Sequence, residues 1–152
     1  CVLYSGASMI FHHAFQPAAV LAALPKATVM MGVPTFYTRL LSDPGLTREV
    51  CTGVRLFISG SAPLSPATHA EWRDRTGHAI LERYGMTETN MITSNPYEGE
   101  RKAGTVGMPL PGVEVRIAGP EGALPQGEAG AIEVRGPNVF KGYWRLPEKT
   151  AA

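Results

Sequence analysis

Residues 82–89 bring together an aromatic ring, a flexible glycine, hydroxyl groups and a carboxylate. The stretch reads Glu82, Arg83, Tyr84, Gly85, Met86, Thr87, Glu88 and Thr89. An aromatic ring can stack on a flat base, a hydroxyl can donate to a phosphate oxygen, and a carboxylate can bind a hard divalent cation. An ordinary connecting turn can have the same composition, so the interpretation depends on a second segment.

The second segment consists of small residues and lies upstream of the first. It reads Ser59, Gly60, Ser61, Ala62, Pro63 and Leu64. Small side chains allow a flat ring to approach the backbone closely. Both segments follow apolar runs that are typical of buried parallel strands, and ligands of open α/β sheets bind beyond the carboxyl ends of strands. We therefore expect the two segments to lie side by side, although residues 59–64 alone also fit an ordinary strand-to-helix turn.

Each chemical group then has a predicted role. A purine would stack between Tyr84 and the backbone of residues 60–62. Thr87 would donate to a phosphate oxygen, and Glu88 would bind Mg²⁺, a cation that prefers oxygen ligands and bridges phosphates. The alternative is a surface loop with a half-buried tyrosine and a solvated carboxylate.

The elements that would position these segments alternate between strands and helices. Predicted strands cover residues 8–11, 27–31, 54–58 and 79–82, and predicted helices cover 17–24, 34–41 and 66–76. Each helix has a proline at its first position, where the missing N–H costs nothing. Ser65 and Gly77 would cap the third helix. The alternation predicts an α/β fold with a parallel-sheet βαβ layer and right-handed crossovers.

The pattern changes in the last third of the chain. Residues 113–117 and 132–134 alternate between apolar and charged side chains, and the segment between them is rich in turn-forming residues. Such alternation is typical of half-buried antiparallel strands. We therefore predict an α/β portion over residues 1–110, followed by the start of an antiparallel β subdomain over residues 111–152.

Composition excludes several functional classes. The chain has 152 residues, 18% charged residues and a net charge of +1, so it has no electrostatic footprint for nucleic acid. No apolar run is long enough to predict a membrane segment. Cys1 and Cys51 lack metal-site spacing and predict unpaired thiols in a reducing cytoplasm.

His69 and His78 are predicted surface groups beside the third helix. The first and last residues suggest a piece of a longer protein.

Four short motifs in order resemble the acyl-adenylate-forming enzymes. This superfamily includes acyl-CoA synthetases, firefly-type luciferases and peptide-synthetase adenylation domains. Residues 84–88 match its YGxTE motif, and residues 59–64 match its adenine-binding segment. Residues 104–112 and 127–144 are similar to the glycine-rich stretches that follow in that family. The resemblance implies the fold of a large N-terminal domain of an acyl-CoA synthetase.

The resemblance also implies a two-step reaction of fatty acid metabolism in the cytoplasm. A carboxylate attacks the α-phosphate of ATP, and coenzyme A then displaces AMP from the acyl-adenylate. Thr87 and Glu88 would be catalytic, with Glu88 as the Mg²⁺ ligand. The nucleotide-binding set would comprise Ser59, Gly60, Ser61, Ala62, Pro63, Glu82, Arg83, Tyr84, Gly85 and Thr87.

Within this superfamily the chain is most similar to the malonyl-CoA synthetases. The resemblance rests on residues 32–41, 90–96 and 137–144 and on Met86 within the core motif. It implies that malonate is the acid and that Met86 limits the length of the acyl chain. The implied acyl-binding set is Val33, Pro34, Arg39 and Met86.

A second carboxylate in the pocket requires a cation, for which Arg39 and Arg55 are the candidates. We interpret Arg55 as structural because it begins a strand. Arg39 also fits an exposed helix end.

Two kinds of alternative remain. The family's phosphate loop, its ribose-binding aspartate and its mobile domain with the catalytic lysine match nothing in this sequence, and we expect them in other parts of the same enzyme. The chain alone would then be an inactive nucleotide-binding or structural fragment. The other alternative is an adenylating enzyme for a different acid, such as a medium-chain synthetase or a peptide-synthetase domain.

Overall fold

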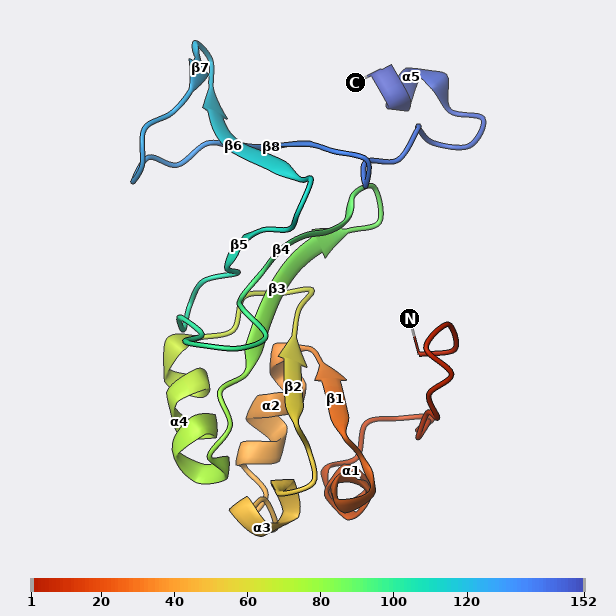
Figure 1. The fold of residues 1–152 in the computed structure, drawn as a ribbon, viewed down its shortest axis with the longest axis vertical. Coiled ribbons are helices and arrows are strands. Elements are labelled where there is room, and N and C mark those ends of the chain that lie inside the picture. The colour runs from red at the N-terminus through yellow and green to blue at the C-terminus, as the bar shows by residue number, and fades with distance from the viewer. Residues whose placement is uncertain (1, 152) are drawn as a thin grey trace. The chain divides into compact units, whose positions relative to one another are not determined.

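The structure, a computed structural model, describes residues 2–151 in two compact units (Figure 1). The first unit ends at Leu81 and the second begins at Glu82. The subdomain boundary that the sequence predicts, between residues 110 and 111, lies between the strands Met108–Pro109 and Glu114–Gly119, which belong to different sheets, and it stays a prediction. Cys1, one of the two predicted free thiols, lies outside the described residues.

The first unit is built from short strands and helices in alternation. Its elements are α1 (Pro17–Ala23), the 3₁₀ helix η1 (Leu24–Lys26), β1 (Val29–Gly32), α2 (Pro34–Leu41), α3 (Arg48–Cys51), β2 (Leu56–Ser59) and α4 (Pro66–Thr76). Strands β1 and β2 pair in parallel, with Val29 opposite Leu56 and Gly32 opposite Ser59. The predicted parallel pairing and α/β fold class are therefore confirmed.

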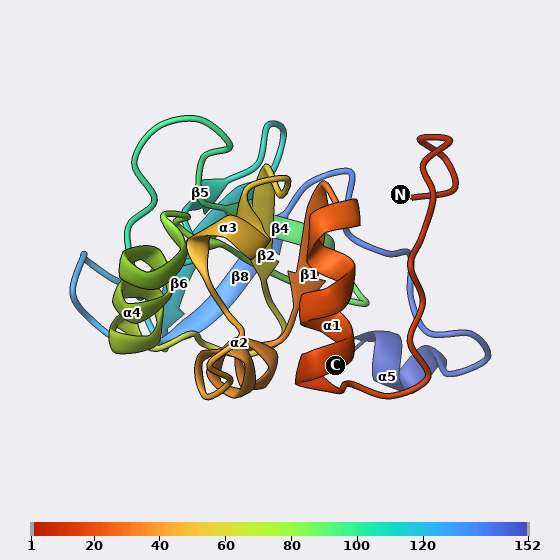
Figure 2. The ribbon, with the colours of Figure 1, turned by 90° about the horizontal axis from the view of Figure 1, so that it is seen from below.

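The helices of this unit begin and end where the sequence predicts. Helices α1, α2 and α4 each have proline at the first turn. The Ser65 hydroxyl accepts the Thr68 N–H at 3.0 Å, and Gly77 ends α4 in the left-handed conformation, with φ of 81°. Figure 2 looks along the strands and shows α2 between α1 and α4, with which it makes contact. The caps and prolines thus set the lengths of the helices that support the strands.

An aromatic cluster fills the core between these helices and β2. The rings of Tyr37 and Phe57 both meet Trp72 edge-on, with centroids 4.9 and 5.0 Å apart. The Tyr37 hydroxyl donates to the Ile58 carbonyl at 2.6 Å, which joins α2 to β2. Arg75 of α4 donates to the carbonyls of Leu41, Asp43 and Leu46 at the end of α2. These contacts fix the end of β2, from which the first predicted binding segment leaves.

Two sequence predictions for this unit are wrong. Residues 8–11 form no strand, and Phe11 and Ile10 are exposed. His69 is buried rather than on the surface, with 3% of its area exposed, and its Nε2 lies 3.1 Å from the Ile80 carbonyl oxygen. An imidazole that shares a hydrogen bond with the backbone can be buried at little cost, and that partner is invisible in the spacing of the helix.

The second unit is antiparallel. It begins at the second residue of β3 (Leu81–Met86) and also contains β4 (Asn90–Ser94), β5 (Met108–Pro109), β6 (Glu114–Gly119), β7 (Gly122–Ala123), β8 (Ala131–Arg135) and α5 (Pro147–Ala151). Strand β4 lies between β3 and β5, and β6 lies between β7 and β8. Ion pairs between Arg116 and Glu133 and between Arg135 and Glu114 connect β6 to β8. The antiparallel strands predicted near 113–117 and 132–134 are confirmed.

Candidate functional site

The segment after β2 connects a buried strand to a capped helix. Ser59 ends β2 with 1% of its area exposed, whereas residues 61–63 are exposed. Leu64 is buried again and anchors the loop just before α4. The Ser59 Oγ is buried and has no hydrogen-bond partner among residues 2–151. The loop therefore presents accessible backbone at the carboxyl end of a parallel strand, which is where α/β folds bind ligands.

Ser61 gives this loop an unusual backbone. Its φ of 66° lies in the left-handed region, which residues other than glycine, asparagine and aspartate seldom occupy. Such a conformation costs on the order of 1–3 kcal/mol and occurs most often where function over-determines the backbone. Gly60 beside it is half-buried and Ala62 is exposed. The backbone of residues 60–62 is therefore accessible, and the approach of a flat ring to it stays a prediction.

The second predicted segment is a hairpin and not a loop after a strand. Strand β3 continues through Met86, four residues beyond the predicted end at residue 82. It turns through residues 87–89 and pairs antiparallel with β4, with Met86 opposite Asn90. Tyr84, Gly85 and Met86 therefore lie on a strand, and only Thr87 and Glu88 of the motif lie in the turn. The β-pairing that extends the strand involves residues downstream of the motif, which local composition does not reveal.

Gly85 permits a bulge in this hairpin. The register shifts between Tyr84 and Gly85. A Cβ atom at Gly85 would lie 2.1 Å from the Asn90 carbonyl oxygen and 2.9 Å from the Met91 Cα. Only glycine allows the two strands to approach this closely. The bulge changes the register of the strand just before the turn, and so sets where Thr87 and Glu88 lie.

The turn presents a hydroxyl and a carboxylate. Thr87 is exposed and Glu88 is half-buried. Oε1 of Glu88 accepts a hydrogen bond of 2.8 Å from the Tyr143 hydroxyl, and the Glu88 carbonyl accepts the Phe140 N–H at 2.7 Å. The bond to Glu88 raises the pKa of the Tyr143 hydroxyl above its ordinary value, so this phenol is a neutral donor at physiological pH.

Glu82 and Arg83 have structural partners within the second unit. Glu82 is buried, with 5% of its area exposed, and its Oε1 accepts the Gly104 N–H at 3.3 Å. The Arg83 Nη1 approaches the Met91 sulfur at 3.1 Å, and its Nε is buried without a partner in the described chain. Glu82 thus fastens the strand to the loop before β5. The assignment of these two residues to nucleotide binding stays a prediction.

The predicted acyl-binding residues lie in different elements. Val33 is the N-cap of α2, and Pro34 is the first residue of that helix. Arg39 is exposed in the last turn of α2, with its guanidinium carbon 4.9 Å from the centre of the Phe15 ring. Met86, at the end of β3, is half-exposed. Val33, Pro34 and Arg39 thus share one helix of the first unit, whereas Met86 belongs to the second unit.

The carboxylates present fit a magnesium–phosphate site and not a metal cage. No cluster of three or more His, Cys, Asp or Glu side chains occurs within residues 2–151. Magnesium commonly binds proteins through one or two carboxylates and takes its remaining ligands from phosphates and water. Glu88 offers one such carboxylate on an accessible turn, beside the hydroxyl of Thr87.

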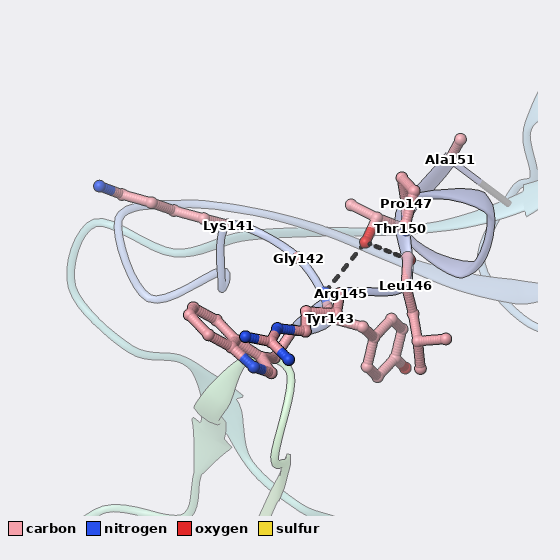
Figure 3. Close-up of a pocket in the computed structure, with 9 residues that line it drawn as sticks. Lys141, Gly142, Tyr143, Arg145, Leu146, Pro147, Thr150 and Ala151 are labelled. Carbon is pink, nitrogen blue, oxygen red and sulfur yellow. Dashed lines mark hydrogen bonds between the residues drawn. The ribbon is translucent and has the colours of Figure 1, made fainter.

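An open hollow lies near the C-terminal end of the second unit. Its walls are Lys141, Gly142, Tyr143, Trp144, Arg145, Leu146, Pro147, Thr150 and Ala151. Figure 3 shows the Thr150 hydroxyl between Leu146 and the backbone of Tyr143, with hydrogen bonds of 3.0 and 2.9 Å. The hollow is shallow and contains none of the predicted site residues. The hollow matters because Tyr143, which lines it, donates a hydrogen bond to Glu88.

Sequence reasoning missed the contacts that hold the turn. Asn138 donates to the Thr89 carbonyl at 2.7 Å, and Tyr143 reaches Glu88 across 55 positions of the chain. The motif containing Gly142 and Tyr143 was visible in the sequence, but nothing in its composition identified the partner.

Comparison with known proteins decides the family. Residues 1–144 match the family of AMP-binding enzymes. The chain belongs to the AMP-binding enzyme family. The fold class predicted from the motifs is thereby confirmed.

Several relatives are CoA ligases. The mitochondrial malonate–CoA ligase ACSF3 of Mus musculus is 39% identical over 99% of this chain and 32% of its own length. The probable CoA ligase CCL8 of Humulus lupulus is 50% identical over 81% of this chain and 22% of its own length. The chain thus spans about a third or less of the length of these relatives.

Solved structures show the same fold. ATP-bound MatB from Rhodopseudomonas palustris superposes with a TM-score of 0.93 and 61% identity, covering 99% of this chain and 30% of MatB. A malonyl-CoA ligase in a product complex with methylmalonyl-CoA and AMP gives a TM-score of 0.78 and 45% identity, covering 90% of this chain and 30% of that protein. Of these two proteins, MatB binds ATP, and the malonyl-CoA ligase binds AMP and methylmalonyl-CoA.

No helix within residues 2–151 is long and apolar enough to cross a membrane. The mouse relative is described as mitochondrial, so the predicted cytoplasmic location stays a prediction.

Proposed function

We propose that the protein containing this chain is an ATP-dependent acid–CoA ligase that acts on malonate. In the first step a malonate oxygen attacks the α-phosphorus of ATP, the bond to the β-phosphate breaks, and pyrophosphate leaves. In the second step the sulfur of coenzyme A attacks the acyl carbonyl, its proton is lost, and AMP leaves. The reaction class is supported by family membership, and malonate is supported by the 39% identity to the mouse malonate–CoA ligase and the 45% identity to the malonyl-CoA ligase.

The proposal gives residues of this chain a role in the first step, and the exposure of Thr87 on the β3–β4 turn supports it. The exposed Thr87 hydroxyl would donate to an α-phosphate oxygen, and the Glu88 carboxylate would hold Mg²⁺. The cation would supply neutralisation of the phosphate charge when bound. Tyr84 and the backbone of residues 60–62 would hold adenine. Positioning and electrostatic stabilisation of this kind account for most of the acceleration in reactions at phosphorus.

The observation that carries the proposal is the hairpin turn itself. The turn places a hydroxyl and a carboxylate one residue apart, and a glycine that tolerates no side chain fixes it. Two further contacts hold the turn, through Phe140 and Asn138. An ordinary surface turn does not need such fixation, whereas a site for phosphate and cation requires it.

The identity of the acid substrate is a more specific proposal than the reaction class. A second carboxylate taken out of water must face a cation or several donors. Arg39 is our candidate for that cation, and Val33, Pro34 and Met86 would shape the pocket. A benzoate CoA ligase from Burkholderia xenovorans, 32% identical over 89% of this chain, shares the fold with a TM-score of 0.81, so the fold alone does not select malonate.

The decisive experiment uses a full-length protein that contains residues 1–152. ATP–pyrophosphate exchange would be measured with malonate, propionate and benzoate, and acyl-CoA formation would be measured with coenzyme A. We expect exchange and CoA ester formation with malonate well above the other two acids. Exchange that no acid stimulates would overturn the ligase assignment. Stronger exchange with propionate or benzoate would overturn malonate alone.

A further inference from the structure

A segment that lacks regular structure encloses the turn that bears Glu88. Residues 136–143 form neither helix nor strand. Nevertheless, three hydrogen bonds connect them to the hairpin. Asn138 donates to the Thr89 carbonyl at 2.7 Å, the Phe140 N–H donates to the Glu88 carbonyl at 2.7 Å, and the Tyr143 hydroxyl donates to Glu88 Oε1 at 2.8 Å. Two of these bonds fix the backbone of the turn, and the third reaches its carboxylate.

Tyr143 is itself held in place. Its backbone N–H donates to the Thr150 hydroxyl at 2.9 Å, and that hydroxyl donates to the Leu146 carbonyl at 3.0 Å (Figure 3). The Phe140 ring meets the Tyr143 ring edge-on, with centroids 4.9 Å apart. A chain of contacts therefore runs from helix α5 through the Tyr143 backbone to the Glu88 carboxylate.

We infer that Tyr143 is the positioning residue for Glu88, holding one carboxylate oxygen so that the other remains available for a divalent cation. The inference rests on the proposed function, because it concerns the cation that accompanies the nucleotide. A carboxylate has two oxygens and about four acceptor sites, so one hydroxyl donor leaves ample capacity for a metal.

The physical reason is the rotamer freedom of a glutamate on an accessible turn. A free glutamate side chain loses conformational entropy when it is fixed. A donor that already restricts the side chain lowers the part of this cost that cation binding must supply. Partners that orient metal-binding carboxylates typically change affinity by roughly 10- to 100-fold. We expect a smaller effect here because Tyr143 is 41% exposed and water can replace part of the bond.

The experiment compares Tyr143→Phe with Tyr97→Phe in a full-length protein that contains this chain. Tyr143→Phe removes only the hydroxyl and keeps the ring against Phe140. Tyr97→Phe removes the same group from another partly exposed side chain of the second unit, which is 53% exposed. The readout is the dissociation constant of Mn²⁺, measured by electron paramagnetic resonance with a non-hydrolysable ATP analogue. Circular dichroism checks that both variants are folded.

We expect Tyr143→Phe to weaken Mn²⁺ binding by about three- to tenfold, with an unchanged KM for malonate and an unchanged melting temperature. Tyr97→Phe should bind Mn²⁺ as the unaltered protein does. Added to Glu88→Gln, Tyr143→Phe should have no further effect, because a positioning residue acts only through its partner.

Three outcomes would overturn the inference. Unchanged Mn²⁺ affinity in Tyr143→Phe would show that the hydroxyl does not position Glu88. Tighter binding would show that it competes with the cation. Equal losses with and without Glu88→Gln would show that Tyr143 acts elsewhere. Acid-stimulated ATP–pyrophosphate exchange in the unaltered protein tests the ligase assignment separately, so failure of the inference and failure of the function remain distinguishable.

Discussion

At the scale of single residues, the Glu88 carboxylate has the clearest chemical assignment. It lies in the β3–β4 turn, one residue from the Thr87 hydroxyl, and its Oε1 accepts a bond from Tyr143. The hydrogen bond from Tyr143 leaves room for a cation, because it occupies only Oε1 and the Glu88 side chain is half-buried. A substitution that removes the charge but keeps the shape is therefore the sharpest test.

Glu88→Gln should reduce ATP–pyrophosphate exchange by on the order of 10²-fold, because an amide is a poor ligand for a hard cation. The amide oxygen can still accept from Tyr143, so the fold should be unaffected. If Glu88→Gln and the unaltered protein showed the same rate of ATP–pyrophosphate exchange over a range of Mg²⁺ concentrations, the assignment would be contradicted. Glu133→Gln on the exposed strand β8 is a matched control, for which we expect an unchanged rate.

Selectivity for the acid also belongs to the residue scale. Arg39→Ala should lower kcat/KM for malonate more than for propionate, because only malonate presents a second carboxylate. Met86→Ala should widen tolerance for 2-substituted malonates by removing bulk from the proposed pocket. Kinetics with both acids measure these ratios, and Arg116→Ala serves as the control for loss of an exposed arginine.

The competing result has a structural interpretation. An unchanged malonate-to-propionate ratio in Arg39→Ala would leave Arg39 as an exposed helix end stacked on Phe15. Arg55, the other candidate cation from the sequence, would then be the next residue to test, together with residues outside this chain.

At the scale of elements, the glycine in β3 decides the shape of the hairpin. A methyl group at Gly85 would lie 2.1 Å from the Asn90 carbonyl oxygen, and the backbone of β4 would have to shift. We expect Gly85→Ala to destabilise the protein by about 1–3 kcal/mol. It should also reduce the rate of ATP–pyrophosphate exchange, because Thr87 and Glu88 lie in the turn that the bulge positions. Thermal unfolding and exchange kinetics measure the two effects.

Gly53→Ala provides the matched control for that substitution. A Cβ there would meet nothing nearer than the Pro25 carbonyl oxygen, at 3.4 Å. Gly53→Ala should therefore change stability by no more than about 0.5 kcal/mol. Equal melting temperatures for the two variants would refute the role of the glycine bulge.

At the scale of the whole molecule, the chain spans about a third or less of its relatives. The phosphate loop and the catalytic lysine that the family resemblance implies have no match in residues 1–152. We therefore predict that a purified 152-residue chain forms no malonyl-CoA from malonate, ATP and coenzyme A. Product above background, measured by chromatography, would disprove this, and a full-length protein run in parallel is the positive control.

The sequence by itself determined the features that depend on neighbouring residues. Proline at first helical positions, Ser65 and Gly77 as caps, and apolar runs fixed helices α2 and α4 and the parallel pair β1 and β2. Short motifs in order fixed the family. These signals are local, because caps and periodicity act within one or two turns of chain.

Only the tertiary structure decided which distant groups meet. It extended β3 through Met86 by pairing it with β4, and it buried His69 against the Ile80 carbonyl. It also brought Tyr143 to Glu88 across 55 positions. Hydrogen bonds of this kind depend on how chain segments pack, so the partner cannot be predicted from the composition of either segment alone. For that reason the sequence identified the carboxylate of the candidate site, whereas the structure identified the residue that holds it.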